Sequence, residues 1–253
     1  MPAAPTSQVS VGIANLPNQR HKIVSRKGTN FTVMVVGESG LGKTTYINTL
    51  FTTLMREYKR PEQRFAKQLD RTVQIDVVRA DIEEKGFNVR LTIIDTPGFG
   101  DYANNQDCWV PIVEFIDEQH QHVMNHETVA NRKVDDLRVH VCLYFIQPTG
   151  HTLKPLDIEV MKQLSSRVNL VPVIAKADTI TPADMLAFKD RIRDCISTHG
   201  IQVYSPAAHS DDEETTRRNT SILAAMPFSI ISSENDVSVN GQMVRGRQYV
   251  WGV

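Results

Sequence analysis

The sequence predicts an α/β fold in which a mostly parallel β-sheet with one antiparallel edge strand forms the middle of three layers. An alternation of segments along the chain and one predicted hairpin carry this prediction. Beyond residue 31, short apolar runs rich in β-branched residues alternate with segments of helical period. Such alternation is typical of a parallel sheet with helices on both faces. The apolar runs predict strands at residues 31–36, 91–95, 139–146, 170–175 and 227–232.

One segment departs from this alternation. Val73, Ile75 and Val77 alternate with polar residues, and the turn sequence at 83–86 leads into a second apolar run that begins at Val89. A strand, a short turn and a second strand predict a hairpin. Its first strand would be the antiparallel edge of the sheet. Farther along, the acidic residues 211–214 predict the start of a helix.

Composition and charge limit the classes of function. The chain has 253 residues, a formal net charge of −1 and 41% hydrophobic residues, enough for one large domain. A net charge near zero gives no global reason to expect nucleic acid as a partner. No apolar stretch reaches the roughly 18 residues of a transmembrane helix, and residues 1–7 lack a signal-peptide core. We therefore expect a protein that is neither secreted nor membrane-spanning.

Two further features concern the cysteines and the beginning of the chain. The three cysteines, Cys108, Cys142 and Cys195, lack the spacing of a zinc site. They are expected to be reduced cytosolic thiols, with Cys142 in the core. Residues 1–30 are rich in Pro, Ala and Ser, then basic, and contain no acidic residue. We predict a mobile N-terminal arm over residues 1–30 and one domain over 31–253.

The first chemical motif is a phosphate-binding loop. Residues 37–44, GESGLGKT, match the pattern G-x-x-x-x-G-K-[ST], between the predicted strand 31–36 and a helix with Ile47 and Leu50 at helical spacing. In this pattern backbone N–H groups surround the phosphates, the lysine reaches the outer phosphates and the hydroxyl binds Mg²⁺. The predicted nucleotide contacts are Gly37, Glu38, Ser39, Gly40, Leu41, Gly42, Lys43, Thr44 and the adjacent Thr45.

A second motif, Asp95-Thr96-Pro97-Gly98, follows a predicted strand. A carboxylate at this place can hold Mg²⁺ together with the Thr44 hydroxyl, and the N–H of a glycine can approach a γ-phosphate closely. By itself the string is also good turn chemistry. Combined with the phosphate loop, this motif predicts Asp95 as a metal ligand and Lys43 and Gly98 as catalytic residues.

A third motif, Ala175-Lys176-Ala177-Asp178, follows another predicted strand. The Asp178 carboxylate can accept hydrogen bonds from N1–H and the 2-amino group of guanine, a donor pair that adenine lacks. The Lys176 stem can pack over the ring, and Ala177 lies between the two. The sequence therefore predicts guanine nucleotides as ligands. Ala175 stands where GTPases usually have asparagine, which removes one tether to the phosphate loop.

Hydrolysis is predicted to be slow. GTPases of the Ras type place a glutamine after D-x-x-G to orient the attacking water, whereas this chain has Phe99. Residues 52–71 and 99–107 lack strong periodicity and are candidate mobile switches. Beside the first, Thr72 could bind Mg²⁺ with its hydroxyl and hold the water with its carbonyl. A threonine at the start of a strand is the alternative interpretation.

With these residues in place, the chain resembles the septins, filament-forming GTPases of the cytoskeleton. The resemblance extends over residues 12–253, and it implies a three-layer P-loop GTPase fold. It also implies that the chain ends at Val253 before a C-terminal element that septins carry, so we expect a truncated septin-type domain. The matching strings are residues 12–19, 37–44, 71–75, 95–101, 150–157, 171–178 and 244–252.

The resemblance also implies residue roles. Thr72 matches the switch threonine of hydrolysing septins, Arg245 matches an arginine that packs against guanine, and the backbone of Ser232 would meet the base. Septin nucleotides lie between subunits. His151 and Trp251 match residues that contact the neighbouring subunit, so the resemblance implies homo- or hetero-oligomers with other septin subunits through the nucleotide interface.

The basic residues of the arm match a septin segment associated with phosphoinositides: Arg20, Lys22, Arg26 and Lys27. About 1 kcal/mol per cation near an anionic leaflet gives weak binding by one subunit. The alternative interpretations of this basic segment are a solvated linker and a buried filament contact, to which equal weight is given. The resemblance further implies a cytoplasmic protein of the cortex or division site.

Taken together, the expectation is a slow GTPase, requiring GTP or GDP and Mg²⁺, that uses the nucleotide to build filament interfaces for cell division. The sequence leaves open a GTP-binding structural subunit without turnover, for which Phe99 argues. It favours a monomeric signalling GTPase least.

Overall fold

This computed structural model describes residues 28–50, 75–84, 87–100, 105, 107–127, 138–206, 213–233, 236–239 and 242–245 of the chain. Several sequence predictions lie outside these residues. They are Thr72, Trp251, the basic residues Arg20, Lys22, Arg26 and Lys27, and the candidate switch at 52–71.

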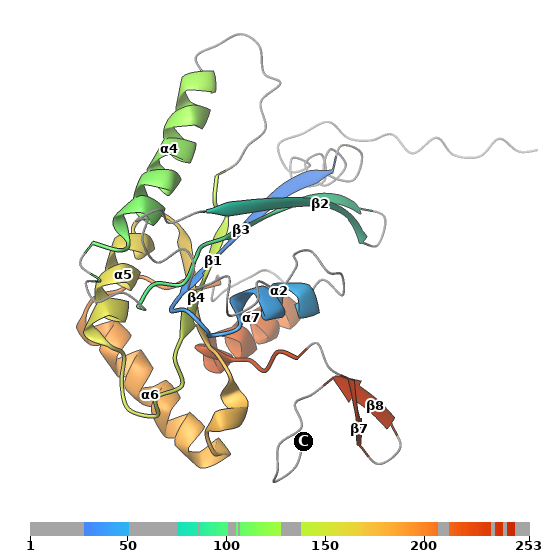
Figure 1. The fold of residues 1–253 in the computed structure, drawn as a ribbon, viewed down its shortest axis with the longest axis vertical. Helices are drawn as coiled ribbons and strands as arrows, with labels where there is room; N and C mark the ends of the chain where they lie inside the picture. The colour runs from blue at the N-terminus through green and yellow to red at the C-terminus, as the bar shows by residue number, and fades with distance from the viewer. Residues whose placement is uncertain are drawn as a thin grey trace, which may run out of the picture.

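The centre of the fold is a six-stranded sheet with the strand order β2-β3-β1-β4-β5-β6 (Figure 1). All neighbouring strands are parallel except β2 and β3, which are antiparallel at one edge. The predicted α/β fold, including its antiparallel edge strand, is therefore confirmed. The strands are β1 (Thr29–Gly37), β2 (Asp76–Glu84), β3 (Phe87–Asp95), β4 (Val141–Ile146), β5 (Asn169–Ile174) and β6 (Phe228–Ser229).

Helices cover both faces of this sheet. In Figure 1, α4, α5 and α6 lie on one side and α2 lies on the other. A separate two-stranded sheet stands near the end of the described chain. The remaining elements are α2 (Lys43–Leu50), α4 (Val110–Glu127), α5 (Pro155–Ser165), the 3₁₀ turn η2 (Ala177–Thr179), α6 (Pro182–Thr198), α7 (Glu213–Ala225), β7 (Asp236–Val239) and β8 (Gln242–Arg245).

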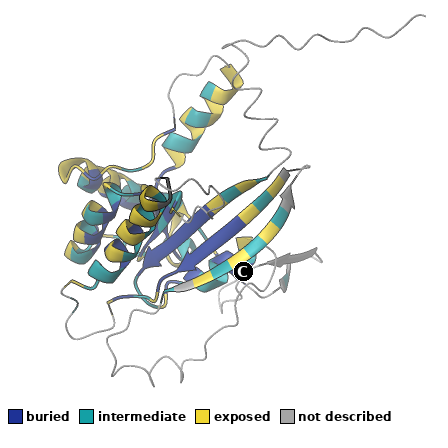
Figure 2. Ribbon diagram, turned by 90° about the horizontal axis from the view of Figure 1, so that it is seen from above, coloured by how far each residue is buried: buried dark blue, intermediate teal, exposed yellow. Residues whose placement is uncertain are grey.

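The core consists of two apolar clusters separated by the sheet, whose central strands are buried in Figure 2. Alternate residues of β1 enter different clusters because successive side chains of a strand point to opposite faces. Met34 joins the cluster that includes Ile116, Met161 and Phe188 from α4, α5 and α6. Val35 joins the cluster that includes Ile47 of α2. Cys142 is fully buried in the first cluster, as predicted.

In the edge strand, burial of the side chains does not follow throughout the apolar alternation that indicated the hairpin. Val77 is 46% exposed, whereas the even-numbered Val78, Ala80 and Ile82 are partly buried. Directly opposed residues of an antiparallel pair share one face. Val78 stands opposite the buried Ile93 and so faces the α2 side of the sheet. Val77 therefore faces the other side, where it remains exposed.

Several boundaries also differ from prediction. β1 begins at Thr29, so Thr29 and Asn30 belong to the sheet and not to the predicted arm, because they pair with β3. In α2, Ile47 is buried but Leu50 is 52% exposed, since the apolar cluster on this side includes Ile47 and not Leu50. The predicted helix near the acidic run 211–214 is present as α7, which begins at Glu213.

The last strand of the sheet is shorter than predicted. β6 pairs with β5 only over Phe228–Ser229. Immediately after it, the Ile230 N–H donates to Ile174 O, and Ile230 O accepts from the Ala177 N–H, each at 3.0 Å. The chain therefore leaves the regular ladder to meet the loop after β5. Within the described ranges, no helix is long and apolar enough to cross a membrane.

Candidate functional site

The predicted motifs follow the carboxyl ends of parallel strands. The phosphate loop begins at Gly37, the end of β1, and Asp95 is the last residue of β3. The base motif follows β5, and residues 230–233 follow β6. In open α/β sheets, ligands bind in the crevice outside the carboxyl ends of the strands. The topology therefore gathers motifs that are far apart in sequence at one edge of the sheet.

The phosphate loop holds its lysine close to its own backbone. Lys43, the first residue of α2, is only 7% exposed. Its Nζ donates to Gly37 O at 2.9 Å and to Glu38 O at 2.7 Å. Gly42, directly before the helix, has a φ of +83°, a conformation that glycine adopts without strain. The Lys43 ammonium group and the amino end of α2 therefore lie close together, and this arrangement suits an anionic ligand.

Thr44 and Asp95, the two described residues that the sequence predicts as metal ligands, are in contact. The Thr44 hydroxyl donates to Asp95 Oδ2 at 3.0 Å, and Asp95 is buried. One hydroxyl and one carboxylate oxygen, beside a loop suited to phosphates, are a donor set that fits Mg²⁺, which takes its other ligands from water and phosphate. No cluster of three His, Cys, Asp or Glu residues suited to a metal occurs among the described residues.

Gly98 packs directly against the phosphate loop. A Cβ at this position would lie 2.2 Å from the Ser39 Cα and 2.4 Å from the Ser39 N. The Ser39 N–H also donates to Phe99 O at 3.0 Å, and Glu38 and Phe99 form a parallel bridge. The sequence suggested that glycine leaves room for a phosphate. The structure adds a second reason: the backbones of these two loops are in contact.

Phe99 is a core residue. It is buried in the cluster below α4, α5 and α6, and its ring centroid lies 6.3 Å from that of Tyr144. A buried phenyl ring can neither donate nor accept a hydrogen bond to water. The predicted switch at 99–107 therefore begins with a side chain anchored in the core. Residues 101–104 and 106 of that segment lie outside the described residues.

The base motif forms a tight turn after β5. Lys176 has the left-handed φ of 48°, and Thr179 closes the turn with its N–H and its hydroxyl on Lys176 O at 3.0 and 2.8 Å. Asp178 lies within this turn and is partly buried. Ala175 is fully buried in the same apolar cluster as Leu41 of the phosphate loop. Apolar packing thus occupies the place where GTPases usually have an asparagine tether.

The remaining predicted residues have different surroundings. Ser232 is buried, and the carbonyl of the adjacent Ser233 accepts from the Thr49 hydroxyl of α2 at 3.3 Å. His151 is exposed, and Arg191 of α6 donates to its carbonyl at 3.3 Å and to that of Gly150. Arg245 is the last residue of β8, and its side chain lies outside the described part. The phosphate loop and the loop after β3 are in contact, whereas His151 faces solvent.

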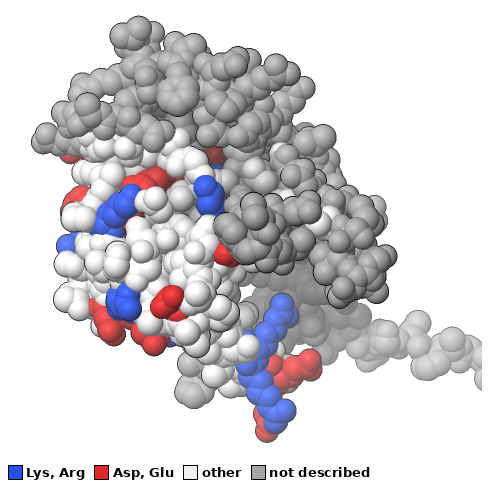
Figure 3. Space-filling model, turned by 60° about the horizontal axis from the view of Figure 1, so that its bottom comes forward, with Lys and Arg blue, Asp and Glu red and all other residues white. Residues whose placement is uncertain are grey.

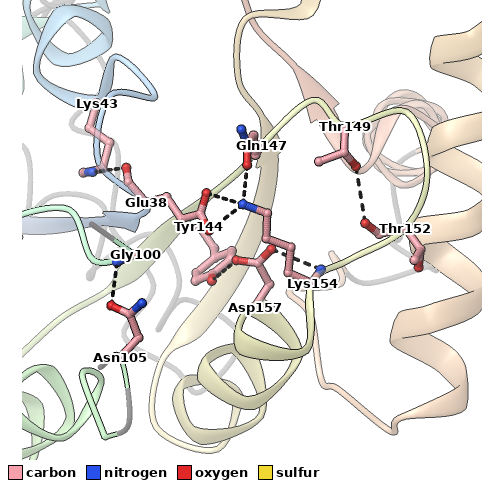
Figure 4. A network of polar contacts seen from close by, with 10 residues as sticks. All are labelled: Glu38, Lys43, Gly100, Asn105, Tyr144, Gln147, Thr149, Thr152, Lys154 and Asp157. Carbon is pink, nitrogen blue, oxygen red and sulfur yellow. Dashed lines mark hydrogen bonds and ion pairs between the residues drawn. The ribbon is translucent and has the colours of Figure 1, made fainter. Parts of the chain in front are cut away.

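A polar network beside the phosphate loop was not predicted (Figure 4). The Tyr144 hydroxyl donates to Asp157 Oδ1 at 2.7 Å, and both residues are buried. Burial raises the pKa of both groups above their usual values. Lys154 donates through Nζ to both carboxylate oxygens of Glu38 at 2.8 Å and to Gln147 Oε1.

The string at residues 150–157 includes Lys154 and Asp157 and could have drawn attention to them. Their partners could not be deduced from it, because Glu38 and Lys154 are 116 residues apart. On the face drawn in Figure 3, the described residues show basic and acidic side chains interspersed.

Comparisons with known proteins agree with this architecture. A family model described as Septin matches residues 27–253. The chain is 49% identical over 245 residues to septin homolog spn4 of Schizosaccharomyces pombe, and 49% identical over 257 residues to cell division control protein 12 of Saccharomyces cerevisiae. These matches cover 96% of this chain but 64% and 63% of the two relatives, so the chain spans a little under two thirds of their length.

A solved structure supports the fold independently. The crystal structure of Cdc11 from Saccharomyces cerevisiae matches with a TM-score of 0.61 and 32% identity, over 86% of each chain. The family model covers far more than half of the chain, and the sequence and fold comparisons give the same family. This chain therefore belongs to the septin family.

Proposed function

We propose that this chain binds GTP with Mg²⁺, hydrolyses it slowly, and uses the nucleotide to build an interface with other septin subunits. The observation that carries the proposal is the Thr44–Asp95 pair at 3.0 Å, directly beside the buried Lys43. A lysine for phosphate oxygens and a hydroxyl–carboxylate pair for the metal are what a nucleoside triphosphate with Mg²⁺ requires. Bound Mg²⁺ would neutralise charge on the phosphates.

Asp178 supports guanine as the base. Its carboxylate can accept from N1–H and the 2-amino group of guanine. Xanthine carries a carbonyl oxygen in place of that amino group, so an amide side chain, which can donate, suits xanthine better. The test is competition between GTP and xanthosine triphosphate for wild type and Asp178→Asn. We expect the variant to reverse the preference, by roughly tenfold or more. A variant that still prefers GTP would contradict this assignment.

Slow hydrolysis is supported by Phe99, whose buried ring leaves no side-chain group there to orient water. The proposed catalytic hydroxyl is Thr72, which lies outside the described residues. A single-turnover assay of bound GTP compares wild type with Thr72→Ala. We expect slow GDP formation by the wild type and a fall of roughly 10- to 100-fold in the variant. No measurable GDP from wild type would favour the structural subunit without turnover.

Assembly with other septin subunits is proposed through His151 and Trp251. The exposure of His151 supports this role, because a residue that acts on a neighbour must be accessible. Sedimentation analysis with GDP, with a non-hydrolysable GTP analogue and without nucleotide tests it. We expect dimers or larger assemblies that depend on nucleotide, and weaker association of His151→Ala. A monomer under all three conditions would contradict the assembly proposal.

A role at the membrane and at the cell cortex or division site rests on family membership and on the basic residues Arg20, Lys22, Arg26 and Lys27. Co-sedimentation with vesicles that contain phosphoinositide tests it. Replacing all four cations by glutamine should abolish binding, since each contributes about 1 kcal/mol near an anionic surface. Equal binding of both proteins would assign the segment to a linker or to a filament contact.

A further inference from the structure

The phosphate loop carries a carboxylate that is held by a cation from another part of the fold. Glu38 is the second residue of the loop, and its side chain is only 14% exposed. Lys154, at the residue before α5, binds both carboxylate oxygens at 2.8 Å (Figure 4). The contact joins residues 116 positions apart in the sequence. An ammonium group at 2.8 Å from both oxygens of a largely buried carboxylate restrains that carboxylate more than a fully exposed ion pair would.

Glu38 lies between three parts of the site. Its backbone carbonyl accepts from Lys43 Nζ at 2.7 Å. Its side chain packs against Gly100, because a Cβ on Gly100 would lie 3.3 Å from Glu38 Cγ and 3.4 Å from Oε1. Holding the Glu38 carboxylate therefore also defines the surface against which the segment after Gly98 packs.

A carboxylate in a phosphate-binding loop has an electrostatic cost. It repels the phosphates, and it repels GTP more than GDP because GTP carries an additional negative charge. Lys154 compensates this charge at contact distance. A second carboxylate is near: Asp157 accepts from the Lys154 N–H at 3.4 Å. Burial is the main cause of the raised pKa of Asp157; the negative charge of Glu38 raises this pKa further, and the positive charge of Lys154 lowers it.

We propose that Lys154 is a positioning residue of the nucleotide site: it neutralises Glu38 and holds it against the segment 98–100, so that the phosphate loop accepts the additional charge of GTP. Lys154 acts through Glu38 and need not touch the nucleotide. It thereby contributes to the preference for GTP over GDP. This inference rests on the nucleotide binding proposed above.

A double-mutant cycle tests the inference. The variants are Lys154→Gln, Glu38→Gln and the double variant, with Lys154→Arg as the conservative replacement. Lys162→Gln is the matched control, because Lys162 is an exposed lysine of α5, the helix that Lys154 precedes. The affinities for GDP and for a non-hydrolysable GTP analogue are measured by fluorescence titration for each protein, and circular dichroism checks the fold.

We expect Lys154→Gln to lower affinity for the GTP analogue by about tenfold and for GDP by about threefold, an order of magnitude that follows from one uncompensated charge near the phosphates. In the Glu38→Gln background the same replacement should cost less than about twofold, because no carboxylate remains to be neutralised. Lys154→Arg should retain most of the preference for the GTP analogue, and Lys162→Gln should behave like wild type.

The outcomes separate the inference from the proposed function. If wild-type protein binds neither nucleotide, the proposed function and this inference both fail. If wild type binds and Lys154→Gln leaves the ratio of the two affinities unchanged, this inference alone is overturned. An equal loss in both backgrounds would likewise overturn it, since Lys154 would then not act through Glu38. If circular dichroism shows that Lys154→Gln is unfolded, Lys154 has a role in stability and not in the nucleotide site.

Discussion

The backbones of Gly98 and Ser39 are in contact: a Cβ at position 98 would lie 2.2 Å from the Ser39 Cα. The two residues belong to different loops, one after β3 and one after β1. The Ser39 N–H donates to Phe99 O at 3.0 Å beside this contact. The phosphate loop and the segment after Asp95 are therefore in main-chain contact, and a shift of one loop alone would break the Ser39–Phe99 hydrogen bond.

Gly98→Ala should separate these two loops. A methyl group cannot occupy a position 2.2 Å from a backbone atom, so the backbone must move. We expect a loss of about 1–3 kcal/mol in the free energy of unfolding. Affinity for the GTP analogue should also fall by roughly tenfold or more. Urea unfolding and fluorescence titration measure the two effects.

Gly200→Ala provides the control for Gly98→Ala. Gly200 follows α6 and has a φ of +64°, and a Cβ there would meet nothing within 4 Å. Its replacement should cost stability through backbone strain of about 1 kcal/mol and leave nucleotide affinity unchanged. If Gly98→Ala binds nucleotide as wild type does, the contact is not important for the site.

Thr44→Ala should remove the dependence of nucleotide binding on Mg²⁺. The variant lacks the hydroxyl that lies 3.0 Å from Asp95 Oδ2. In the presence of Mg²⁺, its affinity for GTP should fall by about 10- to 100-fold, toward the value that wild type shows in excess chelator. Titrations with and without chelator measure this. Thr198→Ala, on the exposed end of α6, is the control. An undiminished response of Thr44→Ala to Mg²⁺ would exclude the hydroxyl as a ligand.

Asp157 should make wild-type stability depend on pH. Its pKa lies above the usual value of 3.8, chiefly because burial disfavours the charged carboxylate. Between 3.8 and the raised value, the folded protein binds more protons at this group than the unfolded chain does. The stabilisation associated with Asp157 is therefore greatest at low pH and decreases as pH rises through this window.

Asp157→Asn isolates this effect. The asparagine does not titrate, and its oxygen can still accept from the Tyr144 hydroxyl. The difference in unfolding free energy, wild type minus variant, should decrease as pH rises above about 4. Urea unfolding at several pH values gives this difference. A constant difference across the range would contradict the raised pKa.

Cys142 should resist alkylation until the protein unfolds. Burial raises the pKa of its thiol to about 12, so almost none of it is thiolate at neutral pH. Cys195 is only partly buried and serves as the internal comparison. With iodoacetamide and mass spectrometry, Cys142 should label roughly 100-fold more slowly than Cys195 in folded protein. The two should label at similar rates in denaturant, and rapid labelling of Cys142 before unfolding would contradict its burial.

Local pattern predicted much of this protein. The succession of strands and helices along the chain could be anticipated, because β-branched runs, helical periods and a hairpin turn are short-range properties of the sequence. The sequence motifs likewise predicted Lys43, Thr44, Asp95 and Asp178 as site residues, since each lies at a fixed spacing within a short string. The register of β2 could not be predicted in this way. An apolar alternation does not reveal which face of the strand packs against the rest of the protein.

Contacts between distant segments were decided only by the tertiary structure. The order of the strands brings residues 37–44 beside residues 95–100, and only then does Gly98 meet Ser39 and Phe99 enter the core. Lys154 likewise reaches Glu38 across 116 residues. Short strings determined the chemistry that is proposed for this chain, because spacing places a few side chains together locally. The three-dimensional packing determined which of those groups restrain one another, because such pairs depend on the path of the whole chain.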